Sequence, residues 1–192
     1  MKIVILNTSE CAGGAAVAAG RLGKALKQAG IQVDKLVRDD TWLNRFRFYW
    51  ERLIIFLCNH LNRKNLFAVS IANTGKDISE HPLIKEADIV HFHWINQGFL
   101  SVSDLGKLVD SGKPIVWTLH DLWPATAICH YPDECEKYRS KCSQCALQVA
   151  NPFFDLANWT YNRKKQIGLS KIYFVGCSKW ITEMAQKSSL LE

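Results

Sequence analysis

Short apolar runs alternate with amphipathic stretches along the whole chain. Six runs are short and rich in apolar residues, which predicts buried strands: residues 2–8, 32–37, 66–72, 88–94, 113–120 and 171–178. Between strands lie stretches with the spacing of amphipathic helices: residues 13–30, 101–112 and 152–168. Continuous apolar strands separated by helices indicate a parallel sheet covered on both faces. The pattern therefore predicts an α/β fold, a Rossmann-like, doubly wound parallel sheet with helices on both faces.

Composition fits one domain of this kind. The chain has 192 residues, of which 48% are hydrophobic and 22% charged, enough to bury one core. The net charge of +6 is compatible with an anionic partner but does not indicate which kind: nucleotide, nucleic acid or membrane surface. The longest apolar run, 53–58, is far below the roughly 20 residues that span a bilayer, and the start lacks the core of a signal peptide. We expect a cytoplasmic protein, with peripheral contact to the inner face of the membrane as an open alternative.

The turn after the first strand is a candidate phosphate site. Ligands of doubly wound sheets bind beyond the carboxyl ends of the strands. There the sequence reads NTSECAGGAA, and Gly13 and Gly14 allow close backbone approach. The following helix would point its free N–H groups at an anion, although the glycines also fit a plain tight turn. The motifs G-x-G-x-x-G and G-x-x-x-x-G-K-[ST] are absent, so we expect neither NAD nor a dehydrogenase or epimerase.

The stretch HFHWINQGF, which ends the predicted strand 88–94, supplies further candidates. His91 and His93 share one strand face because side chains alternate. No cysteine or carboxylate is near on that face, which disfavours a metal site. We expect His93 to face the cleft and His91 to be buried and hydrogen-bonded. Trp94 and Asn96 are expected to help bind donor or acceptor.

Two more strand ends carry polar side chains. TLHD places His120 and Asp121 after the strand 113–120. His120 can donate a hydrogen bond to a sugar hydroxyl or a phosphate, and Asp121 can orient it or accept from substrate. A purely structural His-Asp pair remains an alternative. Ser178 follows the last strand; capping of the next helix is its simplest role, and ligand binding is the second.

Four cysteines follow within 17 residues, spaced C-x5-C-x6-C-x2-C: Cys129, Cys135, Cys142 and Cys145. The C-x2-C half is typical of zinc sites, and four thiolates would form a closed, structural site. Disulfides and free thiols remain alternatives, and His130 could replace one thiolate. In the preferred case the cysteine-rich loop 129–145 is a clamp, and the chemistry lies just ahead of it.

The segment 42–64 combines aromatic and aliphatic residues with five Arg or Lys and one Glu. On a helix, this composition is typical of an interfacial anchor on anionic lipid. A core helix with long basic side chains reaching to solvent explains it as well.

Several of these stretches together are similar to one known family. KIVILNT…GGAA, EADIVHFHWINQGFLS, SGKPIVWTLHDLWPATAICHY and FVGCSKWITEMAQKSSLL resemble the N-terminal half of a family 4 glycosyltransferase of the bacterial surface-polysaccharide type. The resemblance implies the two-domain GT-B architecture and retaining, hexosyltransferase-type transfer from a nucleotide-diphosphate sugar to a saccharide or lipid-linked acceptor, without a catalytic metal. It places Gly13 and Gly14 near the donor diphosphate and His120, beside Asp121, at the transferred sugar.

One departure from the family pattern matters for function. The C-terminal, donor-binding domain, with its E-x7-E motif, is absent from this sequence. The resemblance therefore implies a single N-terminal domain over 1–192, which supplies one wall of the site and is inactive alone.

A second class of function is a non-catalytic, zinc-stabilised basic module that binds protein or nucleic acid. Its support is the stretch 156–182, in which five basic residues meet no acidic one: Arg163, Lys164, Lys165, Lys171 and Lys179. No recognised nucleic-acid motif accompanies them, so we expect no nucleic-acid partner.

Overall fold

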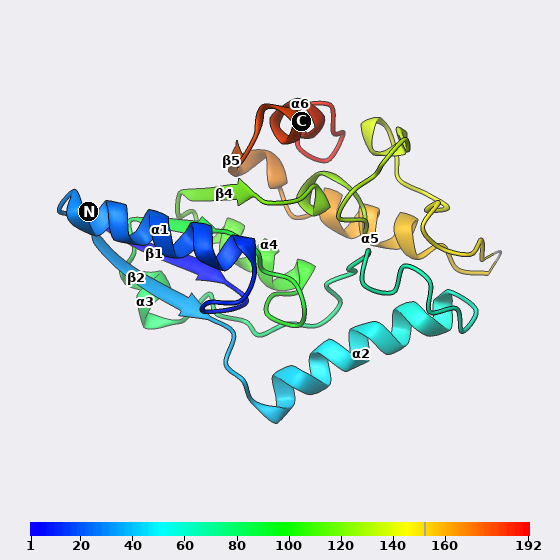
Figure 1. The fold of residues 1–192 in the computed structure, drawn as a ribbon, viewed down its shortest axis with the longest axis horizontal. Helices are drawn as coiled ribbons and strands as arrows, with labels where there is room; N and C mark the ends of the chain where they lie inside the picture. The colour runs from blue at the N-terminus through cyan, green and yellow to red at the C-terminus, as the bar shows by residue number, and fades with distance from the viewer. Residues whose placement is uncertain (152) are drawn as a thin grey trace.

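A parallel five-stranded sheet organises the protein (Figure 1). The structure, a computed structural model, describes residues 1–151 and 153–192. Its strands are β1 (Lys2–Asn7), β2 (Gln32–Val37), β3 (Ile89–Phe92), β4 (Ile115–Leu119) and β5 (Tyr173–Gly176). They lie in the order β2-β1-β3-β4-β5, all paired in parallel. The α/β, Rossmann-like fold predicted from the sequence is confirmed.

Six α-helices lie in the described part of the chain: α1 (Gly14–Gln28), α2 (Trp42–Cys58), α3 (Pro82–Glu86), α4 (Val102–Asp110), α5 (Leu156–Lys165) and α6 (Lys179–Ala185). Helix α4 begins with a capping box of Ser101 and Asp104. The predicted helix 152–168 is shorter in the structure, because Asp155 caps α5 through the backbone N–H of Asn158. Pro152, where that prediction began, lies outside the described residues.

Two apolar cores cover the two faces of the sheet. Helix α1 packs on one face, where Ile3 and Ile5 of β1 meet Ala19 and Val33. The other face holds the larger core, which includes Leu6, Phe92, Trp117 and Trp123. This arrangement follows from the alternation of side chains along each strand. It leaves the carboxyl ends of the strands to loops, where the candidate site is built.

The apolar run 66–72 is not a strand, contrary to the sequence prediction. Its one ladder contact is an isolated antiparallel bridge between Val69 and Cys129. The backbone N–H groups of Ile71 and Ala72 donate instead to Glu51 Oε1 of α2, at 2.7 and 2.8 Å. The run is buried as predicted, but a side chain satisfies its backbone. The strand predicted as the fifth is therefore β4, and the cysteine-rich loop follows it.

Helix α2 lies along the lower edge of the molecule in Figure 1, apart from the sheet. It ends at Cys58, so only part of the predicted segment 42–64 is helical. Arg52 and Glu51 are buried, whereas Arg63 and Lys64 are exposed. Among the described helices, none has the length and apolar character needed to cross a membrane.

Candidate active site

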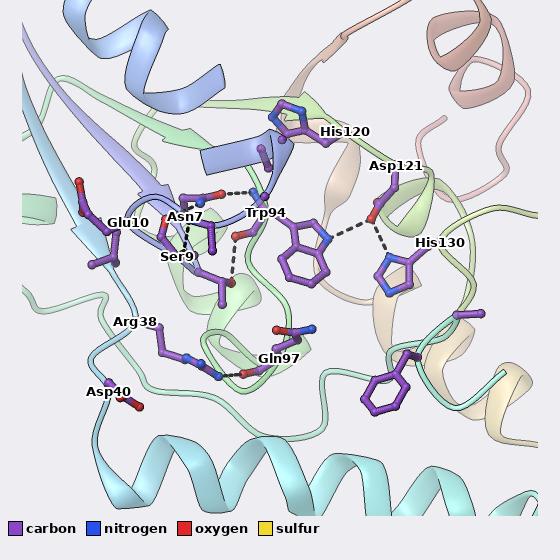
Figure 2. Close-up of a pocket in the computed structure, with 18 of the residues that line it drawn as sticks. Asn7, Ser9, Glu10, Arg38, Asp40, Trp94, Gln97, His120, Asp121 and His130 are labelled. Atoms are coloured by element: carbon purple, nitrogen blue, oxygen red, sulfur yellow. Dashed lines mark hydrogen bonds and ion pairs between the residues drawn. The ribbon is translucent and has the colours of Figure 1, made fainter. Parts of the chain in front are cut away.

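A cavity of about 900 Å³ opens beyond the carboxyl ends of β1, β2, β3 and β4. The strand order reverses here, since β1 has β2 on one side and β3 on the other, and such switch points are the usual ligand sites of doubly wound sheets. Five residues expected from the sequence line it: Gly13, Gly14, Trp94, His120 and Asp121. Figure 2 shows polar side chains from several loops gathered around this space.

The first wall is the turn between β1 and α1. Gly13 has a φ of 88°, a backbone conformation that favours glycine. No described side chain caps the helix that follows. The start of α1 therefore offers uncapped N–H groups and the positive end of the helix dipole at the cavity. This wall is suited to an anionic ligand.

Arg38, which the sequence reasoning missed, adds a positive charge to the cavity. It follows β2 directly and donates from Nη1 to the carbonyl of Gln97 at 2.5 Å. Its Nε has no hydrogen-bond partner among the described residues. Burial lowers the pKa of Arg38, and the nearby Asp40 partly opposes this. Arg38 could have been found from the sequence, because it directly follows a predicted strand, as the other candidates do.

Asp121 forms the centre of a hydrogen-bond network on the opposite wall (Figure 2). Its Oδ2 accepts from Trp94 Nε1 at 3.0 Å and lies 2.6 Å from His130 Nδ1, while its Oδ1 accepts from the Trp123 N–H at 3.0 Å. Burial raises the pKa of Asp121, but the hydrogen bond and charge of His130 and the two other donors outweigh it, so the pKa is lowered overall. The carboxylate therefore stays ionised.

Asp121 does not orient His120, which differs from the expectation for the HD pair. In the described residues no hydrogen bond joins their side chains, and Figure 2 shows the His120 ring apart from the Asp121 carboxylate. His120 Nε2 instead lies 2.8 Å from His93 Nδ1. The orienting neighbour of His120 is thus His93.

Three expected ligand-binding residues do not line the cavity. His93 is 3% exposed and lies beneath His120, and Asn96 is also buried. The Asn96 carbonyl accepts from Thr8 Oγ1 at 2.9 Å, which fixes the loop after β1. Ser178 caps α6 by accepting from the Ile181 N–H, which is the first of the two roles expected for it from the sequence. Each of the three therefore contacts a neighbouring part of the protein: His93 contacts His120, Asn96 the loop after β1, and Ser178 the start of α6.

The zinc site expected at Cys129, Cys135, Cys142 and Cys145 is not supported. The described residues contain no group of three or more His, Cys, Asp or Glu side chains arranged to hold a metal ion. All four are free thiols around a cavity of about 20 Å³. The Cys129 and Cys145 side chains form a hydrogen bond with each other, and Cys142 forms one with the Ala127 backbone. The bond from Cys129 lowers the pKa of Cys145 to about 7.

Lys164 and Tyr161 of α5 hold the loop that follows β4. The buried Lys164 Nζ donates to the carbonyls of Trp123 and Thr126, at 2.6 and 3.0 Å, and lies 3.3 Å from the centre of the Trp123 ring. Tyr161 donates to the carbonyl of Ser140. Burial lowers the pKa of Lys164 well below its usual range. Lys164 is therefore a structural residue, so it cannot belong to a binding surface formed by the basic residues of 156–182.

Comparison with known proteins agrees with this geometry. A sequence model described as Glycosyltransferase Family 4 matches residues 12–165. The chain belongs to this family. The matched range of this family 4 glycosyltransferase domain includes Gly13, Arg38 and His120 of the cavity lining.

One curated relative and the solved structures complete the comparison. The chain is 34% identical over 67 residues to the putative colanic acid biosynthesis glycosyl transferase WcaC of Escherichia coli (strain K12). The match covers 33% of this family 4 glycosyltransferase chain and 16% of the relative, so it spans about a sixth of that protein's length. No solved structure matches the chain.

Proposed function

We propose that this chain is the N-terminal, acceptor-side domain of a retaining GT-B glycosyltransferase. It would transfer a hexose from a nucleotide-diphosphate sugar to a saccharide or lipid-linked acceptor in cell-surface polysaccharide assembly. The observation that carries the proposal is the cavity at the switch point, with the glycine turn on one wall and His120 on another. Family membership supports the reaction class, and the name of the WcaC relative supports the polysaccharide class.

In this proposal the two walls have different tasks. The N–H groups at Gly13 and Gly14 and the guanidinium of Arg38 stabilise the departing diphosphate, as helix termini and cations do for developing negative charge. His120 contacts the sugar that is transferred. The network of Asp121, Trp94 and His130 keeps the wall beside His120 rigid, because all three side chains line the cavity and are joined by hydrogen bonds.

The proposal assigns residues 1–192 to one domain that supplies one side of a two-domain cleft. A second domain would grip the nucleotide and close the cavity against water, which strengthens the electrostatic interactions inside it. We therefore propose that this chain alone does not catalyse transfer. A downstream E-x7-E motif in the reading frame of the gene would support this division.

The first prediction concerns transfer by the full gene product. With a panel of nucleotide-diphosphate hexoses and a lipid-linked saccharide acceptor, we expect a product that keeps the anomeric configuration of the donor. His120→Ala should lower kcat/KM at least tenfold, because a hydrogen bond to the reacting sugar is lost. Mass spectrometry and NMR of the product measure both effects.

Tyr173→Ser is the matched control, since Tyr173 is 69% exposed on β5 and does not line the cavity. This variant should retain the wild-type rate. The proposal is contradicted if no donor gives transfer with the full gene product, or if His120→Ala transfers as fast as the wild type.

We further propose that α2 lies on an anionic membrane surface, which would suit a lipid-linked acceptor. Apolar side chains recur along it at helical spacing and are 40–78% exposed: Trp42, Leu43, Phe46, Tyr49, Trp50, Leu53 and Leu57. Such a contiguous apolar face marks an interaction surface. The exposed Arg63 and Lys64 follow its end, where they can meet anionic headgroups.

The second prediction is binding of the chain to lipid vesicles. We expect co-sedimentation with vesicles of anionic lipid and weaker recovery with neutral ones. The double variant Trp42→Ser, Phe46→Ser should lose most of the bound fraction. Tyr173→Ser should not, because Tyr173 is an aromatic residue of intermediate exposure between those two and lies on β5, away from α2. Equal recovery with both vesicle types, or none with either, would count against the membrane contact.

A further inference from the structure

Three histidine rings follow one another in a row that ends at the cavity. The centroids of His91 and His93 are 4.8 Å apart with planes inclined by 25°, and those of His93 and His120 are 5.1 Å apart with planes inclined by 24°. The row starts at Thr118, whose hydroxyl lies 2.9 Å from His91 Nε2. It ends at His120, the member that lines the cavity.

The contact between the last two rings is a hydrogen bond from nitrogen to nitrogen. His93 Nδ1 and His120 Nε2 are 2.8 Å apart. The centroid distance of 5.1 Å and the inclination of 24° fit rings that lie edge to edge, nearly in one plane, with these two nitrogens between their centres. Burial lowers the pKa of both imidazoles, in His93 to about 3. Both rings are therefore neutral at pH 7, and a single proton lies between them.

The surroundings of His93 decide which ring carries that proton. His93 Nε2 is buried and has no hydrogen-bond partner among the described residues. If His120 were the donor, the neutral His93 would carry its proton on this Nε2, and a buried N–H would be left without an acceptor. Orphaned buried N–H groups are rare and costly. The favoured state has the proton on His93 Nδ1, which donates to His120 Nε2.

The backbone holds His93 in this place. Its N–H donates to the carbonyl of Leu6 at 2.9 Å, and its own carbonyl accepts from Trp117 Nε1 at 2.9 Å. These two bonds fix the backbone of His93 against the sheet and the core.

We propose that His93 is a positioning residue that holds His120 in the tautomer protonated at Nδ1, so that His120 offers the cavity an N–H donor. A neutral imidazole carries one proton, and Nε2 is occupied as the acceptor for His93. His120 then acts as a hydrogen-bond donor to an oxygen of the ligand, such as a sugar hydroxyl or a phosphate oxygen, and not as a base. The identity of this ligand rests on the proposed transferase function; the tautomer does not.

The tautomer can be observed directly in this chain. Long-range ¹H–¹⁵N correlation spectra of protein labelled at histidine distinguish Nδ1–H from Nε2–H. At pH 7.5 we expect His93 and His120 both as the Nδ1–H form. The assignment follows from the loss of single resonances in His120→Asn and His93→Asn. Finding His120 in the Nε2–H form in the wild-type chain would overturn the proposal.

Two substitutions at His93 separate positioning from packing. In His93→Asn the amide nitrogen takes the place of Nδ1 and keeps a donor, so His120 should remain in the Nδ1–H form. In His93→Leu the donor is lost, and His120 should shift to a mixture with the Nε2–H form. Backbone amide spectra show whether each variant is folded. An unchanged His120 tautomer in folded His93→Leu would also contradict the proposal, and the wild-type spectrum decides the question if His93→Leu does not fold.

Kinetics of the full gene product give the second measurement. His93→Leu should lower kcat several-fold with little change in KM for the donor, and His93→Asn should restore most of the rate. The two proposals fail in different ways. Transfer absent with the expected tautomer refutes the transferase function alone, whereas transfer present with the Nε2–H form of His120 refutes the positioning role alone.

Discussion

Lowering the pH from 6.5 towards 4.5 is expected to destabilise the folded chain by several kcal/mol. Burial lowers the pKa of His91 to about 4 and that of His93 to about 3, and the neighbouring histidine rings add to the shift in both. In the unfolded chain the same groups titrate near about 6.5. Between these values the unfolded state binds more protons than the folded state, so the free energy of unfolding falls as the pH falls.

The expected slope is up to about 1.4 kcal/mol per pH unit for each histidine that is fully shifted. Above about pH 6.5 the slope declines, and it vanishes about one pH unit higher, where this contribution is complete. Urea unfolding at a series of pH values measures it. His93→Asn should remove one titrating group and flatten the slope, whereas His60→Asn, at an exposed position with φ of 53°, should leave it unchanged. A free energy of unfolding that is flat between pH 6.5 and 4.5 would contradict the prediction.

Glu51→Gln is expected to lower the free energy of unfolding by about 3–5 kcal/mol. Glu51 is 1% exposed, and its Oε2 lies 3.1 Å from Nη2 of the buried Arg52. Glu51 Oε2 has no hydrogen-bond partner among the described residues. The attraction between Glu51 and Arg52 is therefore that of two opposite charges. The amide of glutamine can still accept from Ile71 and Ala72 through Oε1. The substitution therefore removes the charge and leaves Arg52 buried without a counter-charge.

Chemical unfolding monitored by circular dichroism measures this loss. Glu80→Gln is the matched control, because the ion pair of Glu80 with Lys85 is exposed on both sides, and exposed pairs contribute little to stability. We expect its unfolding midpoint to coincide with that of the wild type. Equal midpoints for Glu51→Gln and the wild type would show that the buried pair does not hold α2 against 66–72.

The sheet could be predicted from the sequence because its central strands are runs of mainly apolar residues. The run 66–72 has the same composition, yet its backbone partners are Glu51 and single residues of the loop after β4. The hydrophobicity of a run predicts that it is buried, but not which group accepts hydrogen bonds from its backbone N–H groups. In the sequence, a strand of about seven residues therefore cannot be distinguished from a buried irregular segment of the same length.

In the candidate site too, the sequence predicted positions but not the partners of the side chains. The rule that ligands lie at strand ends found Gly13, Gly14, His120 and Asp121, and would have found Arg38 had it been applied to the end of β2. It could not assign partners. Asp121 bonds to side chains from two other segments, and the orienting residue of His120 comes from β3, so these pairs depend on how distant parts of the chain meet.

The walls of the cavity are carried by loops from different strands, while the apolar strands beneath them make the core. Changes in the glycine turn, in the residue after β2 or in the loop after β4 would alter the space for a ligand without disturbing sheet packing. The shape of the ligand cavity and the packing of the sheet thus depend on largely separate sets of residues. In evolution, this separation would let the domain change its ligand by many small loop changes while its scaffold stays the same.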